Sequence, residues 1–283
     1  MMTNREYFHR AQNVLPLGVA DNFRHWSGDD MLCIRSARGP FVTDISGSQY
    51  VDFRLGYGPI ILGYRDERVD AAVFSAIRDN GAILGFSTEL ELLVATAICD
   101  FIPGIEKVRF CNSGTEAVIS AIRTARGFTG RSRIVLMDGC FHGLADELMW
   151  RPMYETTTSS PQSLRSLGVG VPRETSTNIT FLKMNDIESA ENLFSSMGDD
   201  IAAVIIEPIL ANSGCVPASQ EFLSALRQLC DQRGSLLIFD EIKTCFRVEG
   251  GSAQAFYGVR PDITTLAKAI GNGYPIAASG GRR

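Results

Sequence analysis

The sequence is poor in the residues that build metal sites and disulfide frameworks. Its 283 residues include three histidines and seven widely spaced cysteines, none of them in a CxxC pair. A structural zinc site needs several such ligands at short spacing, and a disulfide framework needs an even, closely set number of cysteines. The sequence therefore predicts no metal site, and its unpaired cysteines favour a reducing cytoplasm.

Long apolar stretches and basic runs are scarce as well. No apolar stretch approaches the length of a membrane span, and the N-terminal residues MMTNREYFHR lack the apolar centre of a signal peptide. The net charge is −5 at pH 7, so the chain lacks the positive field that attracts nucleic acid or anionic membranes. We predict a cytoplasmic protein with no nucleic-acid partner and no membrane partner. No GxGxxG follows an early strand, which argues against a dinucleotide-binding fold.

What the chain does contain is a core and an alternating pattern. Hydrophobic residues make up 45% of the sequence, which is ample for a globular protein. From residue 107 onward, short apolar runs alternate with amphipathic segments, which predicts an α/β fold with a mostly parallel sheet and helices on both faces. We expect an N-terminal segment at 1–60, with a short helix and a small hairpin, and a large domain at 61–283. Residues 151–178 show little pattern and are predicted to form a loop.

Two residues in the stretch 235–276 could carry chemistry. Asp240 ends the apolar run LLIF, and a carboxylate at the end of a buried parallel strand lies where α/β sheets bind ligands. Lys268 follows another short strand and precedes a Gly-rich loop. A desolvated lysine amine can form a Schiff base with an aldehyde. The alternatives are a solvent-facing lysine and a helix-capping aspartate.

Other strand ends add possible ligands at the same edge of the sheet. Ser113, Gly114 and Thr115 stand at a predicted strand-to-helix turn, where free backbone N–H groups favour a phosphate. A well-capped helix without a ligand explains the same pattern. Phe141 could stack on a flat ring. His142 beside it is otherwise a hydrogen-bonded structural histidine.

Several motifs together resemble a known family. The segments NSGTEAV, GCFHG, IIEP, IFDEIKTCFRV and TTLAKAIGNGYPIAASGGRR resemble class III aminotransferases, which have the pyridoxal-phosphate-dependent transferase fold type I. Within the family, the sequence is most similar to the branch of glutamate-1-semialdehyde 2,1-aminomutase. The resemblance implies a pyridoxal 5'-phosphate cofactor, a seven-stranded type of sheet, an amino or keto acid substrate and a homodimer.

The resemblance also implies roles for individual residues. Lys268 would bond the cofactor and later shuttle a proton, and Asp240 would pair with the pyridinium nitrogen. The phosphate would lie on the 113–115 turn, and Arg24 aligns with an arginine that binds the substrate carboxylate. The ring and its pocket would be contacted by Phe141, His142, Glu207, Asn212 and Ile242.

The sequence departs from the family in two places. Cys245 stands where the family motif has glycine, and a side chain there would be strained if the backbone needed positive φ. The resemblance also implies that family members continue with a substantial C-terminal part, including a small domain, beyond the last residue of this chain. Two alternatives to an aminotransferase or aminomutase therefore stay open: a catalytically impaired family member that binds the cofactor weakly or acts as a dimer partner, and another enzyme of the same fold, such as a racemase or decarboxylase.

Overall fold

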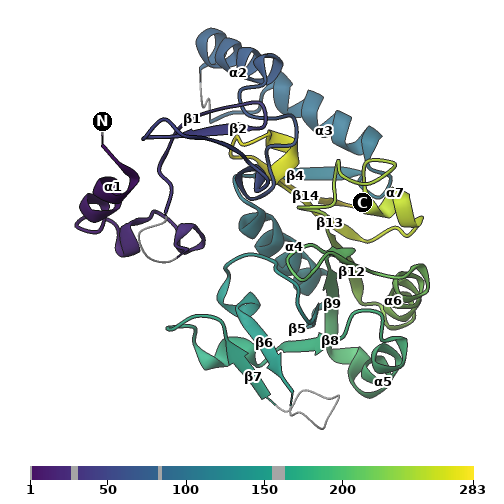
Figure 1. The fold of residues 1–283 in the computed structure, drawn as a ribbon. Helices are drawn as coiled ribbons and strands as arrows, with labels where there is room; N and C mark the ends of the chain where they lie inside the picture. The colour runs from purple at the N-terminus through teal and green to yellow at the C-terminus, as the bar shows by residue number, and fades with distance from the viewer. Residues whose placement is uncertain (1, 27–30, 82–84, 155–162) are drawn as a thin grey trace. The chain divides into compact units, whose positions relative to one another are not determined.

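The computed structural model describes residues 2–26, 31–81, 85–154 and 163–283. The chain divides into two compact units, Met1–Gly85 and Phe86–Arg283, and each unit is described by itself (Figure 1). The division at residue 60 that the sequence suggests stays a prediction.

The first unit combines a small antiparallel sheet with two helices. Helix α1 (Asn4–Ala11) begins with a capping box between Thr3 and Glu6. The sheet has the order β1 (Ile34–Arg38), β2 (Phe41–Asp44) and β3 (Gln49–Val51), and α2 spans Glu67–Asn80. The predicted hairpin is the β2–β3 pair, whose turn forms because the Asp44 carboxylate accepts hydrogen bonds from the N–H groups of Ser46 and Ser48 at 2.9 and 2.8 Å. Short 3-10 turns occupy Pro16–Gly18, Asn22–Arg24 and Leu55–Tyr57.

The second unit is built on a seven-stranded sheet. Its strand order is β4-β14-β13-β12-β9-β5-β8. The bounds are Lys107–Cys111 for β4, Arg133–Met137 for β5, Ile179–Leu182 for β8, Ile201–Ile206 for β9, Leu236–Asp240 for β12, Ile263–Leu266 for β13 and Ala277–Gly281 for β14. Strand β14 runs antiparallel to both of its neighbours, β13 and β4. The other neighbouring strands of this sheet are paired in parallel. The predicted α/β fold with a mostly parallel sheet is confirmed.

Helices cover the sheet on both sides. Helix α4 lies on one side of the sheet, and α5 and α6 lie on the other (Figure 1). The helices of this unit are α3 (Glu89–Phe101), α4 (Gly114–Thr129), α5 (Ile187–Met197), α6 (Gln220–Arg233) and α7 (Ala253–Tyr257). The region 151–178, predicted to be a loop, instead contributes to the paired strands β6 (Trp150–Met153) and β7 (Ser163–Ser166), with 155–162 outside the described residues. A second small pair is β10 (Ile209–Leu210) with β11 (Val216–Pro217).

The main core lies between the sheet and these helices. All six residues of β9 are buried, as are Leu237, Ile238 and Phe239 of β12. Ile122 of α4 packs from one helix, and Phe222 of α6 from another. The continuous apolar runs at 202–206 and 236–239 are explained by this arrangement, because a central parallel strand is covered on both faces.

We expect Phe222→Ala to lower the free energy of unfolding by about 3–5 kcal/mol, since it removes a fully buried ring and leaves a cavity. The matched control is Phe128→Ala, at a ring that is 78% exposed on α4, with a change below about 0.5 kcal/mol. Both values come from chemical denaturation. Equal losses in the two variants would contradict the assignment of the core.

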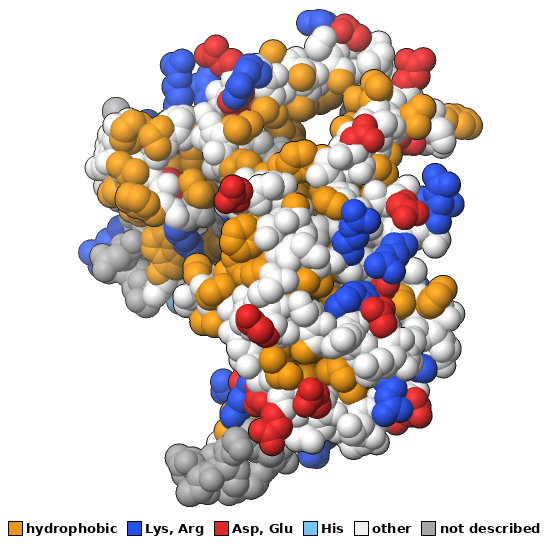
Figure 2. Space-filling model, turned by 90° about the vertical axis from the view of Figure 1, so that its right-hand side faces the viewer, with side chains coloured by type: hydrophobic (Ala, Val, Ile, Leu, Met, Phe, Trp, Pro, Cys, Tyr) orange, Lys and Arg blue, Asp and Glu red, His pale blue; other side chains and the backbone are white. Residues whose placement is uncertain are grey.

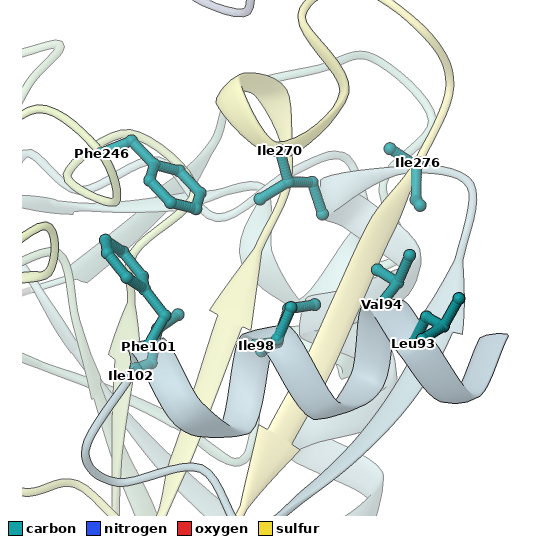
Figure 3. A pocket seen from close by; sticks show the side chains of 9 residues that line it. Leu93, Val94, Ile98, Phe101, Ile102, Phe246, Ile270 and Ile276 are labelled. Atoms are coloured by element: carbon teal, nitrogen blue, oxygen red, sulfur yellow. The ribbon is translucent and has the colours of Figure 1, made fainter. Parts of the chain in front are cut away.

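An apolar hollow of about 470 Å³ lies along α3 (Figure 3). Its walls come from α3 and from the loops that carry Phe246, Ile270 and Ile276, and the rings of Phe101 and Phe246 stack at 5.0 Å beside it. All nine lining residues are apolar, so the hollow offers no group for acid–base or nucleophilic chemistry. The chemistry of the second unit has to be sought elsewhere.

Charge on the molecular surface is mixed in sign. On the face shown in Figure 2, Lys and Arg side chains lie among Asp and Glu side chains. Elsewhere, the largely buried guanidinium of Arg227 bridges Asp231 and Asp262, each at 2.7 Å. Among the described residues, no helix is both long enough and apolar enough to cross a bilayer.

Candidate functional site

The carboxyl ends of neighbouring strands gather the polar side chains of the second unit. Strand β12 ends in Asp240, β9 is followed by Glu207, and β13 is followed by Ala267 and Lys268. Strands β12, β9 and β13 are direct neighbours and run parallel, so these three side chains come from one edge of the sheet. This is the edge at which α/β sheets bind ligands.

Asp240 is a buried carboxylate at this edge whose oxygens are hydrogen-bonded. It is only 3% exposed. Its Oδ1 accepts hydrogen bonds from the Ile242 N–H and the Thr265 hydroxyl, both at 3.1 Å. Thr265 is its register partner on β13, so the sheet itself places the hydroxyl. A buried carboxylate with this many contacts has a fixed orientation.

His142 holds the other oxygen of the same carboxylate. Its Nδ1 lies 2.7 Å from Asp240 Oδ2, and the ring is fully enclosed. Burial alone lowers the pKa of His142, but Cys140 and the hydrogen bond to Asp240 outweigh burial and raise it well above the usual value. The Nε2 atom finds no hydrogen-bond partner among the described residues. His142 lies in the loop after β5, so its ring reaches Asp240 from a strand two places away in the sheet.

Glu207 links two of the loops. Its Oε1 accepts a hydrogen bond from the Phe141 N–H at 2.8 Å, and the residue is buried. Burial raises the pKa of this carboxyl, and the nearby charge of Asp240 adds to the rise against the opposing effect of His142. Phe141 itself is half-buried. Glu207 thus fixes the backbone that carries both Phe141 and His142.

Lys268 sits in a strained and desolvated position. Its φ is 51°, in the left-handed region that non-glycine residues rarely adopt. Burial lowers the pKa of its amine first, and the positive charge of Lys243 lowers it further, against the opposing effects of Asp240 and Glu207. Strain of this kind is typical of functional positions. A lysine with a lowered pKa is a nucleophile at milder pH.

The lowered pKa predicts that Lys268 stays reactive as pH falls toward neutral. Protonation removes the nucleophilic lone pair, and in Lys268 it sets in at lower pH than in an exposed lysine. We expect treatment with a small aldehyde and borohydride at neutral pH to label Lys268 in preference to the exposed Lys107. Peptide mapping over a pH series measures the ratio. A ratio that does not rise on going from alkaline to neutral pH would count against the lowered pKa.

The turn after β4 forms the predicted helix N-terminus. Ser113 caps α4, because its Oγ accepts from the Glu116 N–H at 3.2 Å and donates to Glu116 Oε2 at 2.9 Å. The first N–H groups of a helix have no acceptor within it, which leaves those of Gly114 and Thr115 to face an anion. A Cβ at Gly114 would lie 2.7 Å from Ile242 Cδ1, so the close approach of the 242 side chain requires glycine.

A further contact joins this turn to the loop of Phe141 and His142. The Thr115 Oγ1 accepts a hydrogen bond from the Leu144 N–H at 3.3 Å. Gly143 has φ of +100°, and a Cβ there would lie 2.5 Å from Thr115 Oγ1. Thr115 thus joins the start of α4 to the loop of Phe141 and His142, and His142 and Ile242 both contact Asp240.

Asn212 has a partner that sequence reasoning missed. Its side-chain oxygen accepts a hydrogen bond from the Lys243 ammonium. Lys243 follows Asp240 by three residues, and its charge acts on both Lys268 and Glu207. The signal was present in the sequence as a lysine in the turn after the strand of Asp240. Thr265, two residues before Ala267, was also missed, because its role appears only once β12 and β13 are paired.

The left-handed backbone considered for Cys245 is not found at that residue. Positive φ occurs at the next residue, Phe246, with 61°, and Cys245 is not among the residues with positive φ. Cys245 is fully buried and packs in a small core with Ile98, Ile102 and Leu266. A cysteine is accommodated because this position points into apolar surroundings, and the turn instead places its left-handed residue at 246.

We expect Cys245→Gly to lower the free energy of unfolding by roughly 1–3 kcal/mol, through lost packing and added backbone freedom. Cys215→Gly is the matched control, because Cys215 is exposed with φ of 55°. Glycine there relieves left-handed strain and leaves stability unchanged or higher by up to about 1 kcal/mol. Chemical denaturation gives both values, and a stabilising Cys245→Gly would overturn this explanation.

Arg24 belongs to the first unit. It ends the 3-10 turn Asn22–Arg24, which is capped by the Asp21 carboxylate accepting from the Phe23 N–H at 2.8 Å. The side chain is exposed. Its proposed contact with a substrate carboxylate stays a prediction, while the other predicted site residues all lie in the second unit.

A family model described as aminotransferase class-III matches residues 23–283. The match covers most of the sequence and includes every predicted site residue. The chain belongs to the class-III aminotransferase family, which confirms the resemblance seen in the motifs.

Solved structures give the same family and the same fold. An omega-transaminase from Sphaerobacter thermophilus is 34% identical with a TM-score of 0.92, and the match covers 99% of this chain and 64% of that one. A transaminase with PLP bound is 32% identical with a TM-score of 0.90, covering 100% and 66%. A glutamate-1-semialdehyde-aminomutase from Pseudomonas aeruginosa PAO1 is 26% identical with a TM-score of 0.88, covering 99% and 60%. The chain thus spans less than two thirds of the length of these proteins, between 60% and 66%.

Proposed function

We propose that the chain provides the cofactor-binding part of a pyridoxal-phosphate-dependent aminotransferase or aminomutase, which moves an amino group on an amino or keto acid. The observation that carries this proposal is the pair Asp240 and Lys268 on adjacent strand ends. One is a carboxylate held in place by three partners, and the other is a lysine whose amine has a lowered pKa. The family match supports the same function.

The residues present fit pyridoxal phosphate. The fully enclosed Asp240–His142 pair offers an oriented negative charge for a pyridinium nitrogen. Gly114 lets Ile242 approach the start of α4 closely, and the N–H groups at this helix N-terminus suit a phosphate. Phe141 and Ile242 stand on loops that meet at Asp240 and supply flat and apolar surfaces for a ring. We assign the cofactor contacts to these residues together with Ser113, Thr115, Glu207 and Asn212.

When bound, the cofactor supplies an aldehyde and a ring that accepts electrons. The chain's own residues set the protonation states around it. Asp240 presents its carboxylate at the end of β12, with His142 and Thr265 fixing its orientation. Lys268 Nζ offers a lone pair for bonding and, once released, can accept and return the substrate's proton. Glu207, whose pKa is raised by burial, accepts the Phe141 N–H and so fixes the backbone beside His142.

An aminomutase-like reaction is the second candidate. It returns nitrogen to a neighbouring carbon of one substrate, whereas an aminotransferase passes it to a second keto acid. The likeness to the Pseudomonas aeruginosa aminomutase supports it, although the omega-transaminase from Sphaerobacter thermophilus shares more identity. Arg24 is the proposed carboxylate ligand in either case. A homodimer and a cytoplasmic location, implied by the resemblance, remain predictions.

The test is cofactor binding by the 283-residue chain. We expect added pyridoxal phosphate to give a visible absorbance band of the bound cofactor, and Lys268→Ala to abolish it because the bonding amine is gone. Lys107→Ala, at an exposed lysine, is the matched control and keeps the band. Borohydride reduction followed by peptide mapping identifies the labelled lysine. A band that persists in Lys268→Ala, or label on another lysine, would contradict the proposal.

Amino acids can then be screened by their effect on the band. Nitrogen-labelled substrate separates the two reactions, since the label returns to the same molecule in an aminomutase. Transfer to an added keto acid would favour the aminotransferase.

A further inference from the structure

A second lysine lies at the same edge of the sheet and has no role in the chemistry above. Lys243 follows Asp240 in the turn after β12 and is half-buried. Its ammonium donates a hydrogen bond to the side-chain oxygen of Asn212, on the loop between β10 and β11. An ammonium has three donors, and an amide oxygen is a neutral partner. The charge itself is therefore left uncompensated by this contact.

Hydrogen bonds to Glu241, Lys243 and their neighbours fix the turn that carries Lys243. Glu241 is fully buried, and its carboxylate accepts hydrogen bonds from the N–H of Gln254 at 3.2 Å and from the Gln254 amide at 3.1 Å. The Cys245 N–H donates to the Glu241 carbonyl at 3.0 Å, and Arg247 Nη1 donates to the Lys243 carbonyl at 3.0 Å. Lys243 thus extends from a backbone that is fixed on both sides, as a positioned binding group requires.

The charges around Lys243 favour an incoming anion. Within the described parts of the chain, no carboxylate oxygen lies within 4.0 Å of the Lys243 ammonium or the Arg247 guanidinium. Both cations lie close enough to act on Lys268, and Lys243 also acts on Glu207. Of the two carboxylates at this edge, Asp240 is hydrogen-bonded by His142, Thr265 and Ile242, and Glu207 accepts from the Phe141 N–H. A half-buried cation without an ionic partner is stabilised when an anion binds.

We propose that Lys243, held by Asn212, binds a carboxylate of the substrate at the Lys268 site. The inference rests on the proposed function for the identity of the substrate, an amino or keto acid. It adds a carboxylate ligand from the second unit that is independent of Arg24. Phosphate is the other common anion with the same chemistry, so the experiment has to separate the two.

The experiment measures binding of trifluoropropionate to the 283-residue chain by fluorine NMR, with and without added pyridoxal phosphate. Lys243→Gln can still donate to Asn212 but has no charge, and Lys243→Arg keeps the charge. We expect Lys243→Gln to weaken carboxylate binding about tenfold or more, and Lys243→Arg to stay within about threefold. Lys183→Gln, at the residue that follows β8, is the matched control and leaves binding unchanged. Trifluoropropionamide, which has no charge, should respond to none of these changes.

Each outcome decides the inference. Unchanged carboxylate binding in Lys243→Gln would show that Lys243 only ties the loop of Asn212 to the turn, and would overturn it. So would an unmodified chain that binds no trifluoropropionate. If inorganic phosphate binds the unmodified chain as tightly as trifluoropropionate does, and Lys243→Gln weakens both equally, the ligand of Lys243 is a phosphate and not the substrate carboxylate. The cofactor band is read on the same samples: its absence with a positive carboxylate result would sink the proposed function and leave the anion site standing.

Discussion

The site depends on one buried carboxylate and on what holds it. Asp240 ends the central strand β12, where removal from water would be costly for a charge without partners. Three neighbours supply hydrogen bonds: Thr265 from the adjacent strand, the Ile242 N–H from its own turn, and His142 from the loop after β5. The loops that form the rest of the site are attached to these partners. Glu207 fixes the backbone of Phe141, and Thr115 fixes that of Leu144.

Local patterns made the sheet and the polar residues at its carboxyl edge predictable. The run before Asp240 is apolar at every position because β12 is covered on both faces, and the strand ends place Ser113, Glu207 and Lys268 at one edge. The Ser113–Glu116 spacing predicted the start of α4 because the capping box acts within one turn. Such features depend on neighbours in sequence, which a single chain displays directly.

Contacts between distant segments were not predictable in the same way. His142 and Asp240 are 98 residues apart, and nothing near either residue indicates that they meet. The reversed direction of β14 and the pairing of β6 with β7 are likewise set by tertiary packing. At Cys245, the glycine of the family motif raised the possibility of positive φ, but the structure has positive φ at Phe246 and packs Cys245 into an apolar cluster formed by distant segments.

Lys268 combines two unfavourable features, a left-handed backbone and neighbouring positive charges. A left-handed lysine next to further cations raises the free energy of its surroundings, and it persists only if the scaffold fixes the backbone. The residues before it, Thr264 to Ala267, are buried, and β13 is paired on both sides. The stable sheet therefore supports an amine that resists protonation. A binding anion that compensated Lys243 would weaken the effect of its charge on Lys268, so substrate binding and proton uptake by the amine would be coupled at this edge.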